Sequence, residues 1–150
     1  MLVSESEQVR GAPATVHQRL VDGSVVGTGP NSSATLTFAD GSVLVVGPES
    51  LMTVKLLEYN RGGAWRMRSF YLKVGRLWGS VSPNFGKDSQ LRVYTPASVA
   101  AVRGTIFMVE QARAGDLSTV ACAQGDMAVA GFSGNPVPLP GVTQSQVPRG

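Results

Sequence analysis

The sequence shows no set of residues that is arranged for nucleophilic or acid–base catalysis. The single histidine, His17, and the single cysteine, Cys122, lie more than a hundred positions apart. A Cys–His nucleophile would need both side chains and an orienting third group in contact. Cys122 lies in an apolar segment instead, which is typical of a buried core thiol. The sequence contains no Gly-x-Ser-x-Gly and no His-Glu-x-x-His motif. We therefore predict no catalytic residue and do not expect an enzyme.

Acidic residues are the other candidates for chemistry, as metal ligands. Asp22, Asp40 and Asp126 each lie next to a glycine. Aspartate in such a position commonly bonds backbone N–H groups of a turn. A calcium site would need more clustered oxygens than this pattern offers. We predict no metal site and no cofactor.

The segment of residues 61–78 has the composition of a binding surface, because arginine and large aromatic residues are enriched at interface anchors. The interface candidates are Arg61, Trp65, Arg66, Arg68, Tyr71, Arg76 and Trp78. The alternative stays open that the aromatic residues belong to the core while the arginines cover a solvated outer face.

Composition limits the class of partner. Only 15% of residues are charged, below the roughly 25% of typical soluble domains. The net charge is +3, and ten of the thirteen basic residues are Arg, which favours fixed pairing over a diffuse cationic surface. A nucleic-acid partner is permitted but not indicated. The chain shows neither a signal peptide nor a run long enough for a membrane span, so it is either cytoplasmic or lacks its leader here.

Residues 22–38 and 40–56 form an internal repeat with an offset of 18 positions. Asp-Gly-Ser-Val and Gly-Pro coincide, and each unit reads as turn, short strand, Gly-Pro turn and longer strand. One such unit cannot bury its apolar face alone, so we predict that the two stack as a pair of arches. The residues assigned a structural role in the second unit are Asp40, Gly41, Gly47 and Pro48.

Residues 95–110 are predicted to form the structural centre of the domain. Pro96 ends the preceding strand because proline has no N–H to donate to a sheet. Residues 99–102 and 106–109 are apolar runs, as in strands that are covered on both faces. We expect the strand over residues 106–109 to be central.

Arg103, Gly104 and Thr105 interrupt these two runs. A glycine inside a strand pattern indicates a bulge or a close backbone approach. Two roles stay open for Arg103. The structural role, which the pattern favours, pairs it with Glu110 or Asp40 inside the fold, since an unpaired buried charge is costly. The functional role exposes it to an anionic ligand or partner.

Other glycines predict further turns between short strands. Gly75 is expected to turn the chain after a strand over residues 65–74. Residues 124–126 are expected to connect strands at 117–123 and 127–130 as a hairpin.

Three motifs are similar to those of a known family. Residues 95–109 follow TPxxVAAVRGTxFxV, residues 28–50 follow TGxxSxAxLxFxDGSxLxLGPxS nearly throughout, and residues 72–81 follow LxxGRxWxxV. In these motifs the chain resembles the FecR domain, named for the iron-dicitrate regulator, over residues 25–147. The resemblance implies an extracytoplasmic all-β module of sensing or interaction rather than an enzyme. The chain lacks the anti-sigma helices and membrane helix of full regulators, which favours a cell-envelope binding or assembly module.

We therefore expect an all-β fold, a two-sheet sandwich or solenoid-like stack of short strands and hairpins with little or no helix. Residues 1–15 are expected to be a flexible arm or edge strand, and residues 16–150 a single FecR-like domain. The predicted function is protein–protein interaction, signal relay or envelope assembly in the periplasm or at the cell surface. Partners would be another protein or copies of this chain, bound through sheet edges or the Arg/aromatic face. The alternative is an OB-like domain that binds single-stranded nucleic acid.

Overall fold

The computed structural model describes residues 2–4, 12–59, 65–82, 90–112, 117–131, 137–140 and 143–148. These residues form strands and connections without any helix, which confirms the all-β prediction. The strands are β1 (Leu2–Ser4), β2 (Ala12–Pro13), β3 (Val25–Gly27), β4 (Ala34–Thr37), β5 (Val43–Val46), β6 (Leu51–Tyr59), β7 (Trp65–Ser80), β8 (Gln90–Tyr94), β9 (Ser98–Gln111), β10 (Leu117–Gly131), β11 (Val137–Pro140) and β12 (Thr143–Pro148).

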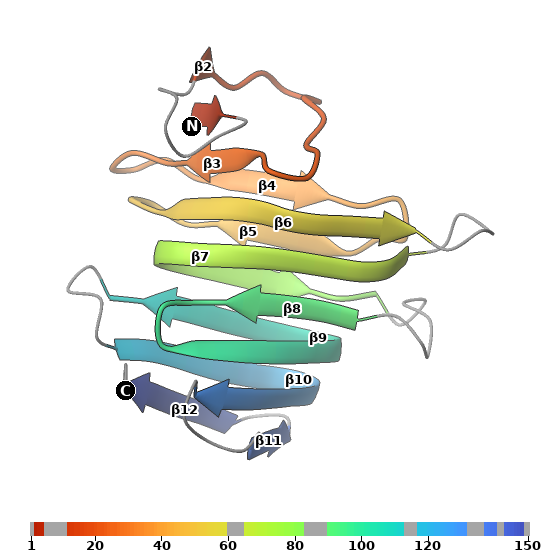
Figure 1. Cartoon of the computed structure of the whole chain (residues 1–150), viewed down its shortest axis with the longest axis vertical. Helices are drawn as coiled ribbons and strands as arrows, with labels where there is room; N and C mark the ends of the chain where they lie inside the picture. Colours follow the sequence, from red (N-terminus) through yellow and green to blue (C-terminus); the bar gives the residue numbers. More distant parts are fainter. Residues whose placement is uncertain are drawn as a thin grey trace.

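All strands belong to one hydrogen-bonded sheet that doubles over into two layers. The main order is β11-β10-β9-β8-β7-β6-β3-β1-β2, and β12, β4 and β5 pair off this path. The first layer contains β3, β6, β8 and the first half of β7; the second contains β4, β5 and the second half of β7. Figure 1 shows β3, β6 and β8 in front, with β4 and β5 fainter behind them. The inward side chains of both layers form a single apolar core.

Three long strands, β7, β9 and β10, pass through both layers. The first half of β7 pairs with β6 and β8, and the second half pairs with β5 and β9. The bend lies at Gly75, whose φ of +107° is a left-handed conformation that favours glycine. A Cβ at this position would collide with Ser50. The predicted turn at Gly75 is therefore a bend within one continuous strand.

The predicted hairpin at residues 124–126 is wrong for the same reason. β10 runs without reversal through this segment, and Gly125 has a φ of +92°. Opposite it, the pairing of β9 with β10 shifts register between Arg103 and Ile106. The bulge expected around Gly104 therefore lies where β9 leaves β8 and begins to pair with β7.

The two repeat units pack against each other as antiparallel arches. β3 pairs with β6, and β4 pairs with β5. At the corner, the hydroxyl of Thr28 donates to the carbonyl of Gly47 at 2.6 Å and accepts the N–H of Ser50 at 2.9 Å. Asn31 and Glu49, at equivalent positions after the two Gly-Pro pairs, both have positive φ, +58° and +51°. The sequence repeat is thus also a repeat of backbone conformation.

β9 lies at the centre of the sheet, between β10 on one side and β7 and β8 on the other. Its burial alternates: Ala100, Val102, Phe107 and Val109 are buried, whereas Ile106 is 47% exposed. The prediction that the strand is covered on both faces is therefore wrong. Each layer has the core on one face and solvent on the other, as is common for antiparallel sheets.

Candidate interaction surfaces

The bend at Gly75 divides the predicted Arg/aromatic surface. Side chains alternate along a strand, and in β7 Tyr71 faces outward from the first layer while Arg76 and Trp78 face outward from the second. Arg61 lies outside the described residues, and so do the side chains of Trp65 and Arg66, although these two belong to β7. The candidates that can be placed thus lie on opposite faces.

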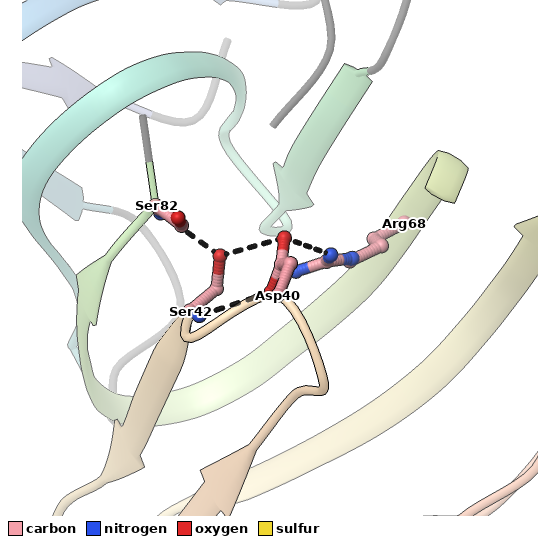
Figure 2. Close-up of polar contacts among 4 residues, drawn as sticks. All are labelled: Asp40, Ser42, Arg68 and Ser82. Atoms are coloured by element: carbon pink, nitrogen blue, oxygen red, sulfur yellow. Dashed lines mark hydrogen bonds and ion pairs between the residues drawn. The ribbon is translucent and has the colours of Figure 1, made fainter. Parts of the chain in front are cut away.

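Arg68 is the exception, because its side chain points into the core and has no exposed area. Its Nη2 lies 2.5 Å from Oδ2 of Asp40, whose side chain is 14% exposed. The same carboxylate accepts the N–H of Ser42 at 2.9 Å and its hydroxyl at 3.1 Å. The Ser42 hydroxyl in turn accepts the N–H of Ser82 at 2.9 Å. Figure 2 shows these contacts joining Asp40 and Ser42 to Arg68 on β7 and to Ser82, which follows the end of that strand.

Aromatic rings complete the surroundings of this arginine. The guanidinium carbon lies 4.4 Å from the ring centre of Phe38, and Phe38 meets Phe70 edge to face at 6.3 Å. The prediction of Arg68 as an interface residue is wrong, since a fully buried side chain cannot reach a partner. A signal was present in the sequence: Arg68 has the same strand parity as the apolar Phe70 and Leu72.

The environment of Asp40 favours its charged form. Partial burial alone would raise the pKa of Asp40, but the N–H of Ser42 and the guanidinium of Arg68 outweigh that effect. The pKa therefore lies below its usual range.

Arg103 is exposed rather than buried. The two carboxylates considered as its structural partners are bonded to other arginines: Asp40 to Arg68, and Glu110 to Arg76. The expectation that Arg103 closes a polar gap inside the fold is therefore corrected. Gly104 and Thr105 lie in β9, but their side-chain surroundings are outside the description.

The outer side of the second layer carries an apolar patch on three neighbouring strands, which we call the Trp78 face. It consists of Val43 and Val45 on β5, Trp78 on β7, and Ile106 and Met108 on β9. Trp78 pairs directly with Val45 and Met108 and is 38% exposed.

Two neighbours hold the indole of Trp78 in place. A Cβ on Gly47 would lie 2.8 Å from the ring, so this glycine permits the ring to lie against the backbone. The guanidinium of Arg76 lies 5.5 Å from the ring centre, and its Nε donates to Glu110 at 2.5 Å. Pro48 follows Gly47 at the corner, where its carbonyl accepts the Ser50 hydroxyl at 3.1 Å.

The outer side of the first layer is basic instead, and we call it the basic face. It carries Lys55, Tyr71, Lys73, Arg92 and Tyr94 on β6, β7 and β8. Tyr71 and Tyr94 are register partners on adjacent parallel strands. Lys55 Nζ lies 5.4 Å from the centre of the Tyr71 ring.

A buried polar cluster fixes the turn around Pro96. The hydroxyl of Thr95 accepts the N–H groups of Ala97 at 3.2 Å and Ser98 at 2.9 Å. It also bonds the hydroxyl of Ser118 at 2.7 Å, and Ser118 donates to Gln111. The turn that connects β8 to β9 is thereby hydrogen-bonded to β10.

The two residues considered as a nucleophile pair, His17 and Cys122, differ in their surroundings. His17 is exposed, whereas Cys122 is buried in the core, as its sequence predicts. No three His, Cys, Asp or Glu side chains among the described residues are placed to hold a metal ion. Within the same residues no helix could cross a membrane.

Comparison with known proteins places the chain in a family. The model of the family described as FecR protein matches residues 24–128, which is more than half of the chain. The chain belongs to the FecR protein family. This finding confirms the resemblance seen in the Gly-Pro and Val-Arg-Gly-Thr motifs. No curated protein matches the chain significantly.

Two crystal structures of a proposed anti-sigma factor from Parabacteroides distasonis ATCC 8503, at 1.65 and 2.50 Å resolution, have a similar fold. They match with TM-scores of 0.66 and 0.67 at 17% identity. Each match covers 83% of the FecR-family chain and 55% of the solved one. The chain therefore spans about half the length of these structures, and at this identity the likeness shows the fold alone.

Proposed function

We propose that this FecR-family domain is a non-catalytic module of protein–protein interaction that acts in signal relay or assembly at the cell envelope. Family membership supports a regulatory role. The observation that carries the proposal is the Trp78 face, where a large aromatic side chain lies exposed among apolar neighbours on three adjacent strands. Tryptophan is among the residues most enriched at the energetic centres of interfaces.

The proposal places the domain in the periplasm or at the cell surface, with another protein or a second copy of the chain as partner. An exposed apolar sheet face is costly to leave in water, and such patches mark interaction sites. The Arg76–Glu110 pair lies at the rim of the patch and would set orientation more than affinity.

The OB-like alternative is not supported. An OB-fold is a five-stranded, partly open barrel, whereas the described strands form one large mixed sheet in two layers.

Site-specific photo-crosslinking in cells of the source organism tests the proposal. A photoreactive amino acid at Ile106, 47% exposed on the Trp78 face, should yield one discrete crosslinked product. The same group at Val16, 86% exposed on a loop, serves as the control. Trp78→Ala should abolish the product at Ile106. Absence of a product at Ile106, or identical products at Val16, would contradict the proposal. Fractionation of the tagged chain should recover it outside the cytoplasm.

A further inference from the structure

The two outer faces of the domain differ in charge. Three described cations project from the first layer: Lys55, Lys73 and Arg92. Two described carboxylates lie near them, Glu58 on β6 and Asp22, which accepts the N–H of Leu57 at 2.7 Å. The second layer has Arg76 balanced by Glu110. Among the described residues, the first layer therefore carries more cations than carboxylates, whereas Arg76 and Glu110 balance each other on the second.

Two of the three cations of the basic face, Lys55 and Arg92, contact its tyrosines. Lys55 lies over the ring of Tyr71, a cation–π geometry. Arg92 lies 3.5 Å from the Tyr94 hydroxyl and donates to Gln90 at 2.7 Å. Because these side chains are already ordered, less conformational entropy is lost when an anion binds.

The same geometry limits which anion fits. Single-stranded nucleic acid binds through bases that stack on exposed aromatic rings. Here Lys55 covers a face of the Tyr71 ring, so the ring positions a cation and does not offer a stacking platform. Carboxylates, by contrast, need only the ammonium and guanidinium donors that the face presents.

We infer that the basic face binds an acidic polypeptide segment. In an extended segment, alternate residues point to one side about 7 Å apart, so carboxylates at every second position present a row of negative charges to the cations on β6, β7 and β8. The inference rests on the proposed interaction function. It adds a second contact surface, opposite the Trp78 face, that recognises acidic side chains.

Binding of a fluorescein-labelled peptide of twelve alternating Glu and Ser residues tests the inference by fluorescence polarisation. Lys73→Gln combined with Arg92→Gln removes two charges from the basic face. Arg19→Glu lowers the net charge by the same two units at an exposed position outside this face and is the matched control. We expect about tenfold weaker binding in the first variant, equivalent to about 1.4 kcal/mol, and less than about twofold in the control. Melting curves confirm that both variants are folded.

Equal loss in the double variant and in Arg19→Glu would overturn the inference, because binding would then follow net charge alone. Tighter binding of a twelve-residue oligothymidylate or of an oligouronate than of the peptide would also overturn it, in favour of nucleic acid or polysaccharide. The crosslink at Ile106 reports independently on the Trp78 face. A persistent crosslink without peptide binding therefore rejects this inference and leaves the proposed function standing.

Discussion

Arg68 and Asp40 form an ion pair between the core-facing side of β7 and the turn that connects β4 to β5. Their side-chain atoms are 2.5 Å apart although the residues are 28 positions apart in sequence. The pair therefore bonds the turn at the start of the second repeat unit to β7, the strand that passes through both layers. A charged contact here is structural, and its removal should affect folding before it affects binding.

Arg68→Met should strongly destabilise the domain. Removing one partner of a buried pair commonly costs about 3–5 kcal/mol, because the other charge stays buried and unpaired. Asp40 retains some exposure, so we expect the lower end of this range, which corresponds to a fall in Tm of about 6–12 °C. Arg76→Met breaks the exposed pair with Glu110 and should cost less than about 1 kcal/mol. Similar losses in both variants, measured by thermal denaturation, would contradict the structural role of Arg68.

The free energy of unfolding should fall at acidic pH, because Asp40 becomes protonated. Its folded pKa lies below the unfolded value of about 3.9. A group with a lowered folded pKa contributes full stability above the unfolded pKa, and this contribution is lost as the pH falls through the folded pKa. The difference in Tm between the wild type and Asp40→Asn should therefore be constant near neutral pH and shrink below about pH 4. A difference that is independent of pH from 2 to 7 would show that the carboxylate charge contributes nothing.

Gly79→Ala should overpack the core of the second layer. The added Cβ would collide with the ring of Phe107 and lie 2.8 Å from Leu44. Overpacking of this kind typically costs about 1–3 kcal/mol. Adding Phe107→Leu should recover part of the loss, because the smaller side chain makes room. Urea denaturation of both single variants and the double variant measures the coupling; strictly additive losses would mean that the two residues do not share the space.

Thr95→Val should destabilise the turn around Pro96 although it preserves the shape of the side chain. The change removes the hydroxyl that accepts two backbone N–H groups and bonds Ser118. Each buried polar group left without a partner costs about 1–3 kcal/mol, so we expect a total near 2–4 kcal/mol. Thr95→Ser keeps the hydroxyl and should retain most of the stability in chemical denaturation. If Thr95→Ser and Thr95→Val lose the same amount, packing of the methyl group and not hydrogen bonding holds the turn.

The all-β class, the repeat and the family motifs were predictable because they depend on local patterns: alternation, Asp-Gly turns and Gly-Pro corners. The course of the chain at Gly75 and Gly125 was not. A glycine with positive φ serves equally in a hairpin and in a bend, and only long-range pairing with neighbouring strands distinguishes the two. This is why Tyr71 and Trp78, close in sequence, were assigned to one surface but lie on two.

Arg68 and Arg103 were misassigned for a related reason. The sequence suggested a buried arginine beside Gly104, because apolar runs flank it, but alternation leaves every second position of β9 outside the core. The buried arginine lies instead in β7, which also carries the exposed Lys73 and Arg76. The sequence predicts a structural role for its partner, Asp40, but which arginine Asp40 meets depends on how β7 crosses the layers.

Because β7, β9 and β10 each contribute hydrogen bonds to both layers, neither layer can open while the other stays intact. Loss of one of these strands would remove neighbours on two sides of the core at once. The domain should therefore unfold in a single transition, with slow amide hydrogen exchange in the inner strands of both layers and faster exchange only toward the terminal strands.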